Sequence, residues 1–232
     1  MKQIKEAIIL AGGLGTRLRD AVPELPKCMA PINGKPFISI VINYLQNQGI
    51  EHFIFSLGYK SEAFTNYLAE ILPEGTYSIV VENEPLGTGG AIRFACSAVT
   101  TSDVLVVNGD SIFKNKLSEQ SKLHFEKNAH CTLALKPMEN FDRYGAVELN
   151  EDHHIALFNE KQFVAKGLIN GGVYLLNVQA YLDENLPEKF SFETDYLQQF
   201  FRTRNIIGIE QNGYFIDIGI PEDYLRAQTE LK

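Results

Sequence analysis

The sequence predicts an α/β fold: a doubly wound, mostly parallel, Rossmann-like sheet with a small antiparallel insertion. Up to about residue 136, apolar runs of strand length alternate with amphipathic runs of helix length, as in a parallel sheet covered on both faces. After Pro137, short strand-like runs follow one another without long helices between them, which favours an antiparallel addition. A chain of 232 residues, 45% apolar and 22% charged, is long enough to bury a large core.

The first half opens with a compact apolar run over residues 6–10 that ends in Gly-Gly, as expected of a buried parallel strand. Pro36 stands where a first helical residue is expected, and Gly49 ends the helical pattern that covers 37–48. The other elements expected in this half are strands at 52–57, 77–82, 103–107 and 131–135, and helices at 61–72, 89–99 and about 118–128.

The second half is expected to contain more strand than helix. Its expected strands cover 146–149, 155–158 and 172–176, and helices return at 192–204 and 222–231. No internal repeat or low-complexity linker separates the two halves in the sequence. We therefore expect a single domain over residues 1–232, in which halves of about 1–136 and 137–232 share one core.

Charge and cysteine content narrow the partners and the compartment. The formal net charge of -8 disfavours nucleic acid and anionic membrane as partners, since both would repel the chain. No apolar run reaches the roughly 18 residues of a membrane span, and the short apolar start fits a first strand better than a signal peptide. Three scattered cysteines form neither a disulfide framework nor a zinc ligand set. We expect a cytoplasmic protein.

A glycine-rich loop follows the first predicted strand, with the sequence Leu-Ala-Gly-Gly-Leu-Gly-Thr-Arg-Leu over residues 10–18. In open α/β sheets ligands bind beyond the carboxyl ends of the strands, where glycine amides can approach phosphate oxygens closely. The loop lacks the Gly-Lys-Ser/Thr of a P-loop, and Leu18 stands where the dinucleotide-binding fingerprint needs its third glycine. A simple glycine turn is the remaining alternative.

Two cations near this loop favour phosphate binding over a simple turn. Arg17 ends the glycine-rich stretch, and Lys27 follows ten residues later in a segment rich in proline. An arginine and a lysine on one loop can bracket a triphosphate, one neutralising the leaving phosphates and the other holding the α-phosphate.

Gly-Gly-x-Gly-Thr-Arg-Leu followed by Leu-Pro-Lys-x-Met-x-Pro resembles the signature of the sugar-phosphate nucleotidyltransferases, or NDP-sugar pyrophosphorylases. The resemblance spans almost the whole chain and implies their Rossmann-like, GT-A-like fold. It also implies a magnesium-dependent enzyme that joins a nucleoside triphosphate to a sugar 1-phosphate, with Arg17 and Lys27 as catalytic phosphate contacts. Cys28 replaces a proline of many members. The nucleotide-binding residues implied in the loop are Leu10, Ala11, Gly12, Gly13, Gly15, Thr16, Arg17 and Lys27.

The segment Glu-Asn-Glu-Pro-Leu-Gly-Thr-Gly-Gly over residues 82–90 resembles the family's base-binding loop. Its glycines are expected to leave room for a flat base. Either Glu82 or Glu84 could accept hydrogen bonds from the ring N–H and amine of guanine, although either could equally be solvated. The loop occurs in guanylyl, thymidylyl and uridylyl members and does not fix the base. The nucleotide-binding residues expected here are Glu82, Glu84, Gly87, Thr88 and Gly89.

Two aspartates are the candidate metal ligands. Asp110 follows a predicted strand, beside Asn108 and Gly109, which we assign to the nucleotide site. An aspartate after glycine is often only a turn residue, but the sheet edge makes metal binding the better interpretation. The resemblance implies that Asp217, at the end of the run 214–217, shares a Mg²⁺ ion with Asp110.

The resemblance places the sugar 1-phosphate in the second half, on motifs that match the family in order. These motifs include a Tyr-Gly-Ala-Val stretch, a Glu-Lys pair and an Asn-Gly-Gly stretch, although a Glu-Lys pair alone is ordinarily solvated surface. Lys161 would grip the sugar's phosphate and act in catalysis, whereas Glu193 matches a further element and could merely cap a helix. The sugar-binding residues expected are Tyr144, Gly145, Glu160, Lys161, Asn170 and Gly171.

The expected reaction is in-line attack of a sugar phosphate oxygen on the α-phosphorus, which needs no general base because the nucleophile is already anionic. The short layout looks most similar to bacterial D-glycero-D-manno-heptose 1-phosphate guanylyltransferases, which use GTP. Mannose 1-phosphate guanylyltransferases and N-acetylmuramate 1-phosphate uridylyltransferases remain open, as does a non-catalytic regulatory relative. A dinucleotide-dependent oxidoreductase is disfavoured by Leu18. Monomer and homodimer are both compatible with the sequence.

Overall fold

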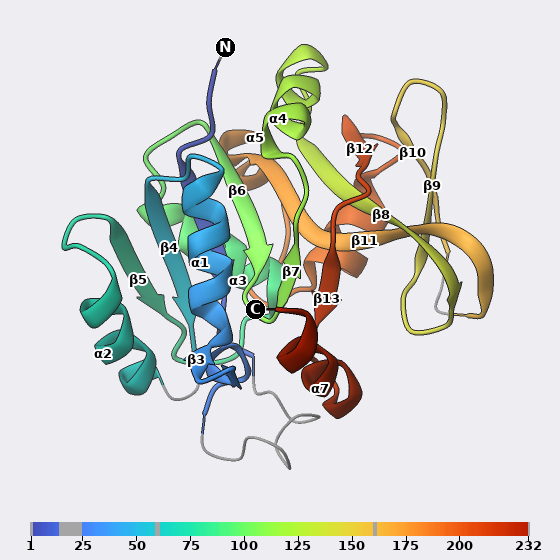
Figure 1. The fold of residues 1–232 in the computed structure, drawn as a ribbon. Coiled ribbons are helices and arrows are strands. Elements are labelled where there is room, and N and C mark those ends of the chain that lie inside the picture. Colours follow the sequence, from blue (N-terminus) through green and yellow to red (C-terminus); the bar gives the residue numbers. More distant parts are fainter. Residues whose placement is uncertain (1, 14–24, 59–60, 160–161, 232) are drawn as a thin grey trace.

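A nine-stranded mixed sheet forms the centre of the molecule in the computed structural model, which describes residues 2–13, 25–58, 61–159 and 162–231 (Figure 1). The strands follow the order β10-β9-β11-β6-β1-β4-β5, and β8 pairs with β11 and β12. The pairs β1·β4, β1·β6, β4·β5 and β8·β12 are parallel, and β11 is antiparallel to β6, β8 and β9. Their bounds are β1 Glu6–Leu10, β4 His52–Leu57, β5 Tyr77–Val81, β6 Asp103–Asn108, β8 Cys131–Phe141, β9 Ala146–Leu149, β10 Ile155–Phe158, β11 Val164–Asn177 and β12 Ile206–Glu210.

Helices cover both faces of the sheet, and Figure 1 shows α1 and α7 in front of it. One face carries α1 (Phe37–Asn47), α2 (Ser61–Ile71), α4 (Leu117–Glu126) and α7 (Pro221–Glu230). The other carries α3 (Gly87–Ala95), α5 (Val178–Leu182) and a π-helix (Phe192–Leu197) that continues into α6 (Gln198–Phe200). Two small antiparallel ribbons pair β7 (Ser111–Phe113) with β13 (Phe215–Asp217) and β2 (Pro31–Ile32) with β3 (Lys35–Pro36). The expected doubly wound, mostly parallel fold is thus confirmed.

Alternation along the central strands divides the core between the two faces. In β1, Ile9 packs into the core beneath α1 and α2, whereas Ile8 packs into the core beneath α3. Successive side chains of a strand point to opposite faces, so a strand buried on both sides must be apolar at every position. This is why residues 7–10 are all apolar ahead of the glycine loop, whereas the buried Glu6 that starts the strand accepts hydrogen bonds from the Thr100 and Thr101 amides.

Several elements differ from the sequence-based expectation, among them β7, β12 and α5, which were not expected. Strand β8 continues through Pro137 to Phe141, because β12 ends opposite Leu135 and leaves an open edge where proline is tolerated. Strand β11 is 14 residues long and contains a register shift between Asn170 and Tyr174. The helix expected over 192–204 is a π-helix followed by one short α-helical turn.

Within the described part of the chain, every helix is too short or too polar to span a lipid bilayer.

A buried polar network around Asp103 holds the amino end of β6. The Asp103 carboxylate is 5% exposed and accepts hydrogen bonds from Lys2 (2.5 Å), Ser102 (2.7 Å), Asn177 (3.0 Å) and His124 (3.3 Å). Burial alone would raise its pKa, but the bonds from His124, Lys2, Ser102 and Asn177 outweigh burial and hold the pKa well below its usual range. The network therefore favours the ionised carboxylate in the folded state.

Replacement of Asp103 by Asn should lower the free energy of unfolding at pH 7 by about 3 kcal/mol, because the donors arranged around the buried carboxylate lose their negatively charged acceptor. Since the folded-state pKa is depressed, this contribution is present above the unfolded pKa of about 4 and is lost as the pH falls toward the folded value. The difference between wild type and variant in urea unfolding should therefore shrink between pH 5 and pH 3 (roughly the range around that unfolded pKa). A Lys5→Ala control, which breaks an exposed ion pair with Glu51, should change stability little. A pH-independent difference for Asp103→Asn would contradict this account.

Candidate active site

A cavity of about 670 Å³ opens at the carboxyl ends of the parallel strands, the lower end of the sheet in Figure 1. This edge is where open α/β sheets bind ligands, because the strand-to-helix loops converge there. The cavity is lined by residues at or just beyond the carboxyl ends of four strands. These are Leu10, Ala11, Gly12 and Gly13 for β1, Ser56 and Gly58 for β4, Glu82, Asn83, Glu84 and Pro85 for β5, and Asn108 and Asp110 for β6. The other lining residues are Lys27, Cys28, Gly87, Thr88, Ala91, Glu193 and Gly219.

The described start of the glycine-rich loop forms one wall of this cavity. The Ala11 amide donates to the Ser56 carbonyl (2.9 Å), which continues the β1·β4 ladder by one residue. Gly12 packs so closely on the next turn that a Cβ there would lie 3.1 Å from the Gly58 nitrogen, whereas a Cβ on Gly13 would meet open space. Gly15, Thr16 and Arg17, expected to complete the phosphate loop, lie outside the described residues.

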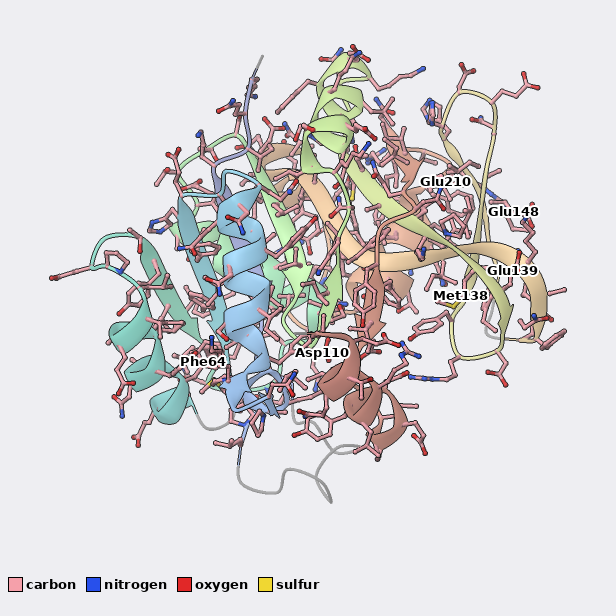
Figure 2. All side chains as sticks on the ribbon, in the orientation of Figure 1. Phe64, Asp110, Met138, Glu139, Glu148 and Glu210 are labelled. Carbon is pink, nitrogen blue, oxygen red and sulfur yellow. The ribbon has the colours of Figure 1, made fainter. Side chains whose placement is uncertain are left out.

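A three-residue charge cluster lies beside the cavity. The Lys27 ammonium contacts Asp110 Oδ2 at 2.5 Å and Asp217 Oδ1 at 3.3 Å. Lys27 begins a 3₁₀ turn, Asp110 follows β6 and Asp217 ends β13; Figure 2 shows Asp110 at this rim, above α7. The three side chains are only 16%, 35% and 27% exposed, so water screens their attraction less than it would a surface pair. Two expected metal ligands and one expected catalytic cation thus lie together.

The backbone around Asp217 fixes the position of its carboxylate. The Ile218 amide donates to the Asp110 carbonyl (3.0 Å), which ties the two aspartate segments together. The Gly219 amide donates to Asp217 Oδ1 (2.7 Å), and a Cβ on Gly219 would lie 2.7 Å from the Lys27 ammonium. A side chain at this position would push Lys27 and Asp217 out of their present positions.

The aspartate pair fits a divalent cation on the evidence of its own geometry. A positively charged nitrogen already contacts both carboxylates, so the two groups converge on one cation position. No group of three or more His, Cys, Asp or Glu that could hold a metal occurs among residues 2–13, 25–58, 61–159 and 162–231. Magnesium commonly takes one or two carboxylates and completes its shell with water and substrate phosphate oxygens. The donor set therefore suits a metal held jointly with a phosphate substrate.

Neither the nearby thiol nor the nearby phenol is available as a nucleophile. Burial, followed by the negative charge of Asp110, raises the pKa of the Cys28 thiol to about 12. Burial, followed by the charge of Asp217, raises the pKa of Tyr144 to about 12. Both groups stay protonated at neutral pH, since deprotonation would place a second anion beside a carboxylate.

The two candidate base-reading carboxylates differ in how firmly they are held. Glu82 is half-buried, accepts a hydrogen bond from the Leu86 amide (3.0 Å) on Oε2 and lies 3.3 Å from the Ser56 hydroxyl through Oε1. Glu84 also lines the cavity but is exposed. A carboxylate fixed by a backbone amide is the better preorganised acceptor, which favours Glu82.

Glycine is required at positions 87, 89 and 90 for a different reason from the one expected. They were expected to leave room for a base, but Gly87, Gly89 and Gly90 lie against residues 188–190. A Cβ on Gly89 would come within 2.2 Å of the Phe190 ring, and one on Gly87 within 2.5 Å of the Phe190 carbonyl. Gly87 and Thr88 still line the cavity, whereas Gly89 is buried behind it. These positions need glycine because another segment packs on them.

The residues expected to bind the sugar lie around β7, β11 and β13 rather than in the cavity wall. Tyr144 packs edge-on against Phe215 of β13, with ring centres 5.9 Å apart. A Cβ on Gly171 would lie 2.4 Å from the Phe113 ring, one on Gly145 would lie 2.7 Å from the Asn159 carbonyl, and Asn170 donates to the Tyr174 hydroxyl (2.8 Å). Gly109, which was expected in the nucleotide site, also packs closely: a Cβ there would lie 2.8 Å from the Leu10 carbonyl oxygen. Glu160 and Lys161 fall outside the described residues.

Several lining residues were not expected from the sequence. Ser56 is the last residue but one of β4, after three apolar residues, and a polar residue at that point was an available signal. Gly58, Ala91 and Gly219 carry no chemical group that would single them out. Their importance arises from close packing of distant segments, which sequence spacing does not reveal.

Comparisons with known proteins identify the family of this chain. The family model described as Nucleotidyl transferase matches residues 6–232. A D-glycero-alpha-D-manno-heptose 1-phosphate guanylyltransferase from Aneurinibacillus thermoaerophilus is 47% identical over 227 residues, covering 98% of each chain. A protein of the same name from Campylobacter jejuni is 44% identical over 219 residues, covering 94% of this chain and 96% of the relative.

A solved structure has the same fold. The crystal structure of HddC from Yersinia pseudotuberculosis complexed with GMP-PN superimposes with a TM-score of 0.88 and 36% identity, covering 99% of this chain and all of the other. The family expected from the sequence motifs is therefore confirmed. These matches, which extend over the length of the chain, show that it belongs to the nucleotidyl transferase family of enzymes.

Proposed function

We propose that this enzyme transfers the guanylyl group of GTP to D-glycero-α-D-manno-heptose 1-phosphate, giving GDP-heptose and pyrophosphate. The proposal is supported by the two relatives that carry this name over nearly their full lengths. The observation that carries the chemistry is the convergence of Lys27, Asp110 and Asp217 beside a cavity whose wall includes Glu82. We infer one domain over 1–232, with a nucleotide-binding half of about 1–136 and a sugar-binding half of about 137–232, acting in the cytoplasm.

The reaction would be an in-line displacement. An oxygen of the sugar's phosphate forms a bond to the α-phosphorus of GTP while the bond from that phosphorus to the β-phosphate's bridging oxygen breaks, so pyrophosphate leaves with the electron pair. No proton has to be removed from the nucleophile, which fits the protonated state of Cys28 and Tyr144. The main barrier is repulsion between two anions, so positioned cations are the required catalysts.

Members of this family generally use a divalent metal, and we propose Mg²⁺ held by Asp110 and Asp217. When bound, the ion would neutralise phosphate charge. Lys27 would hold a phosphate oxygen at the same end of the cavity. Arg17 and Lys161 would supply further positive charge to the nucleotide and to the sugar's phosphate.

Glu82 would select guanine. Its two carboxylate oxygens can accept from the adjacent ring N–H and amino group of guanine, whereas uracil and thymine offer one N–H beside an acceptor. The Leu86 amide fixes this carboxylate in place.

The direct test of the function crosses GTP, ATP, UTP and CTP with heptose 1-phosphate, mannose 1-phosphate and N-acetylmuramate 1-phosphate, and identifies products by mass. GDP-heptose should form with the highest kcat/KM. A preference for another pair would replace the substrate assignment, and a lack of product with every pair would overturn the enzymatic role.

A Lys27→Met variant should lose turnover by about 100-fold or more, since it removes a preorganised cation of similar length. It should also bind Mn²⁺ about tenfold more tightly without nucleotide, because two neighbouring carboxylates lose their counter-ion. Steady-state kinetics and electron paramagnetic resonance titration measure the two effects. Lys35→Met, which removes an exposed lysine nearby, should show neither. Near-normal turnover with unchanged Mn²⁺ affinity would exclude both roles for Lys27.

A Glu82→Gln variant should lose roughly 10- to 100-fold in its preference for GTP over UTP, the range expected for a charged hydrogen bond. The amide presents one acceptor and one donor, which complement the N–H and carbonyl of uracil. Competition between the two nucleotides in one assay measures the preference. Glu84→Gln, at the exposed carboxylate two residues away, is the matched control and should keep it. If both variants keep the wild-type preference, the base is read elsewhere.

A further inference from the structure

Glu193 brings a carboxylate into the same cavity wall as Lys27, Asp110 and Glu82. It is the second residue of the π-helix and is half-buried. The proposed mechanism gives this carboxylate no role. A carboxylate beside a phosphate site is unfavourable because the two negative charges repel each other, so a role for it has to be sought.

Capping of the helix does not account for Glu193. The cap is Ser191, whose hydroxyl accepts a hydrogen bond from the Thr194 amide (3.2 Å). Asp195 completes the turn by accepting from the Ser191 amide (2.8 Å). The helix start therefore has its own capping groups, and the Glu193 side chain extends to the cavity instead.

Two hydroxyl groups hold the Glu193 carboxylate in one orientation. The Thr88 hydroxyl donates to Oε2 at 2.8 Å, and the Ser191 hydroxyl lies 3.2 Å from the same oxygen. The Phe192 amide in turn donates to the Thr88 hydroxyl (2.8 Å), which directs the Thr88 proton toward Glu193. Because both contacts use Oε2 and a carboxylate accepts about four hydrogen bonds, Oε1 keeps the capacity to accept another.

A buried tyrosine connects this carboxylate to β11. Tyr174 is 1% exposed, and burial, followed by the Glu193 charge, raises its pKa well above the usual value. Its hydroxyl therefore stays protonated and already accepts a hydrogen bond from Asn170 (2.8 Å). Glu193 is thus held at the start of α3 through Thr88, and its charge acts on the Tyr174 hydroxyl of β11.

We propose that Glu193 is a specificity-determining residue for the sugar 1-phosphate, and that Oε1 accepts a hydrogen bond from a hydroxyl of the sugar ring. This rests on the proposed function. A carboxylate repels phosphate but binds neutral hydroxyl groups, which excludes the phosphates as its target. Base recognition is assigned to Glu82, and the link through Tyr174 and Asn170 leads into the half of the chain that we assign to the sugar.

The first test compares Glu193→Gln and Glu193→Ala with wild type, with GTP and heptose 1-phosphate varied separately. Both variants should lower kcat/KM for the sugar by about 10- to 100-fold, alanine more than glutamine, since a hydrogen bond to a charged group is lost. The KM for GTP should stay within about twofold, because no bond to the nucleotide changes. Glutamine keeps the shape and an oxygen for Thr88, so Glu193→Gln should melt close to wild type. Glu188→Gln removes an exposed carboxylate from the same segment and should match wild type.

The second test asks which hydroxyl is bound, using 2-, 3- and 4-deoxy analogues of heptose 1-phosphate. In wild type one analogue should lose as much kcat/KM as Glu193→Ala does with the intact sugar. For that analogue, Glu193→Ala should cause no further loss of kcat/KM. For each of the other analogues, the loss caused by the variant should add to the loss caused by the missing hydroxyl.

The outcomes separate this assignment from the proposed function. The sugar contact would be overturned, and the enzymatic function kept, by either of two results with an active wild type. One is that the losses caused by Glu193→Ala and by the deoxy analogue add for every analogue; the other is that the Glu193 variants raise only the KM for GTP. Equal losses for both substrates with a lower melting temperature in Glu193→Gln would reduce Glu193 to a structural link. A wild type inactive with every sugar 1-phosphate would overturn the proposed function and this assignment together.

Discussion

The attraction of two aspartates for one cation is the interaction on which the site depends. Asp110 and Asp217 are 107 residues apart in the sequence, and they approach each other because β13, which ends at Asp217, pairs with β7 directly after Asp110. Two carboxylates this close would repel one another in a partly shielded place, and Lys27 offsets that repulsion. The Lys27 ammonium holds this position, 2.5 Å from Asp110 and 3.3 Å from Asp217. The fold thus preserves a position for a cation before substrate arrives.

The site also depends on strand β11, which packs against the β6 side of the cavity. It is antiparallel to β6 and carries Asn170, Gly171 and Gly172 beyond the last residue pair that the two strands form, Val173 with Val107. Gly172 has φ of +69°, and a Cβ there would lie 2.6 Å from the Asn108 amide, so β11 touches the cavity's β6 wall. The register shift in β11 lies at the same place. Asn170 pairs with Leu135 and Tyr174 with Leu133, so Gly171 and Gly172 belong to a bulge in β11 just before Tyr174.

Local patterns in the sequence were sufficient to predict much of the fold. Buried strands such as 6–10 and 52–57 were evident because both faces of a central strand are apolar, and α1 was evident from its helical spacing. Features that depend on distant partners were not evident. The passage of β8 through Pro137 depends on where β12 ends, and the glycines after Leu86 depend on Phe190, about 100 residues away in sequence. For the site, Lys27, Asp110 and Asp217 were predicted from motifs, but the network around Glu193 was not, because its members come from three separate segments.

The claim that the aspartate pair forms a cation site can be tested directly by locating Mn²⁺ from its anomalous scattering in crystals grown with GTP. One peak should appear between Asp110 and Asp217, about 2.0 to 2.3 Å from a carboxylate oxygen of each, with Lys27 no longer between them. A map without a peak there, or with the ion bound only to phosphate oxygens and Lys27 still contacting both aspartates, would contradict the account.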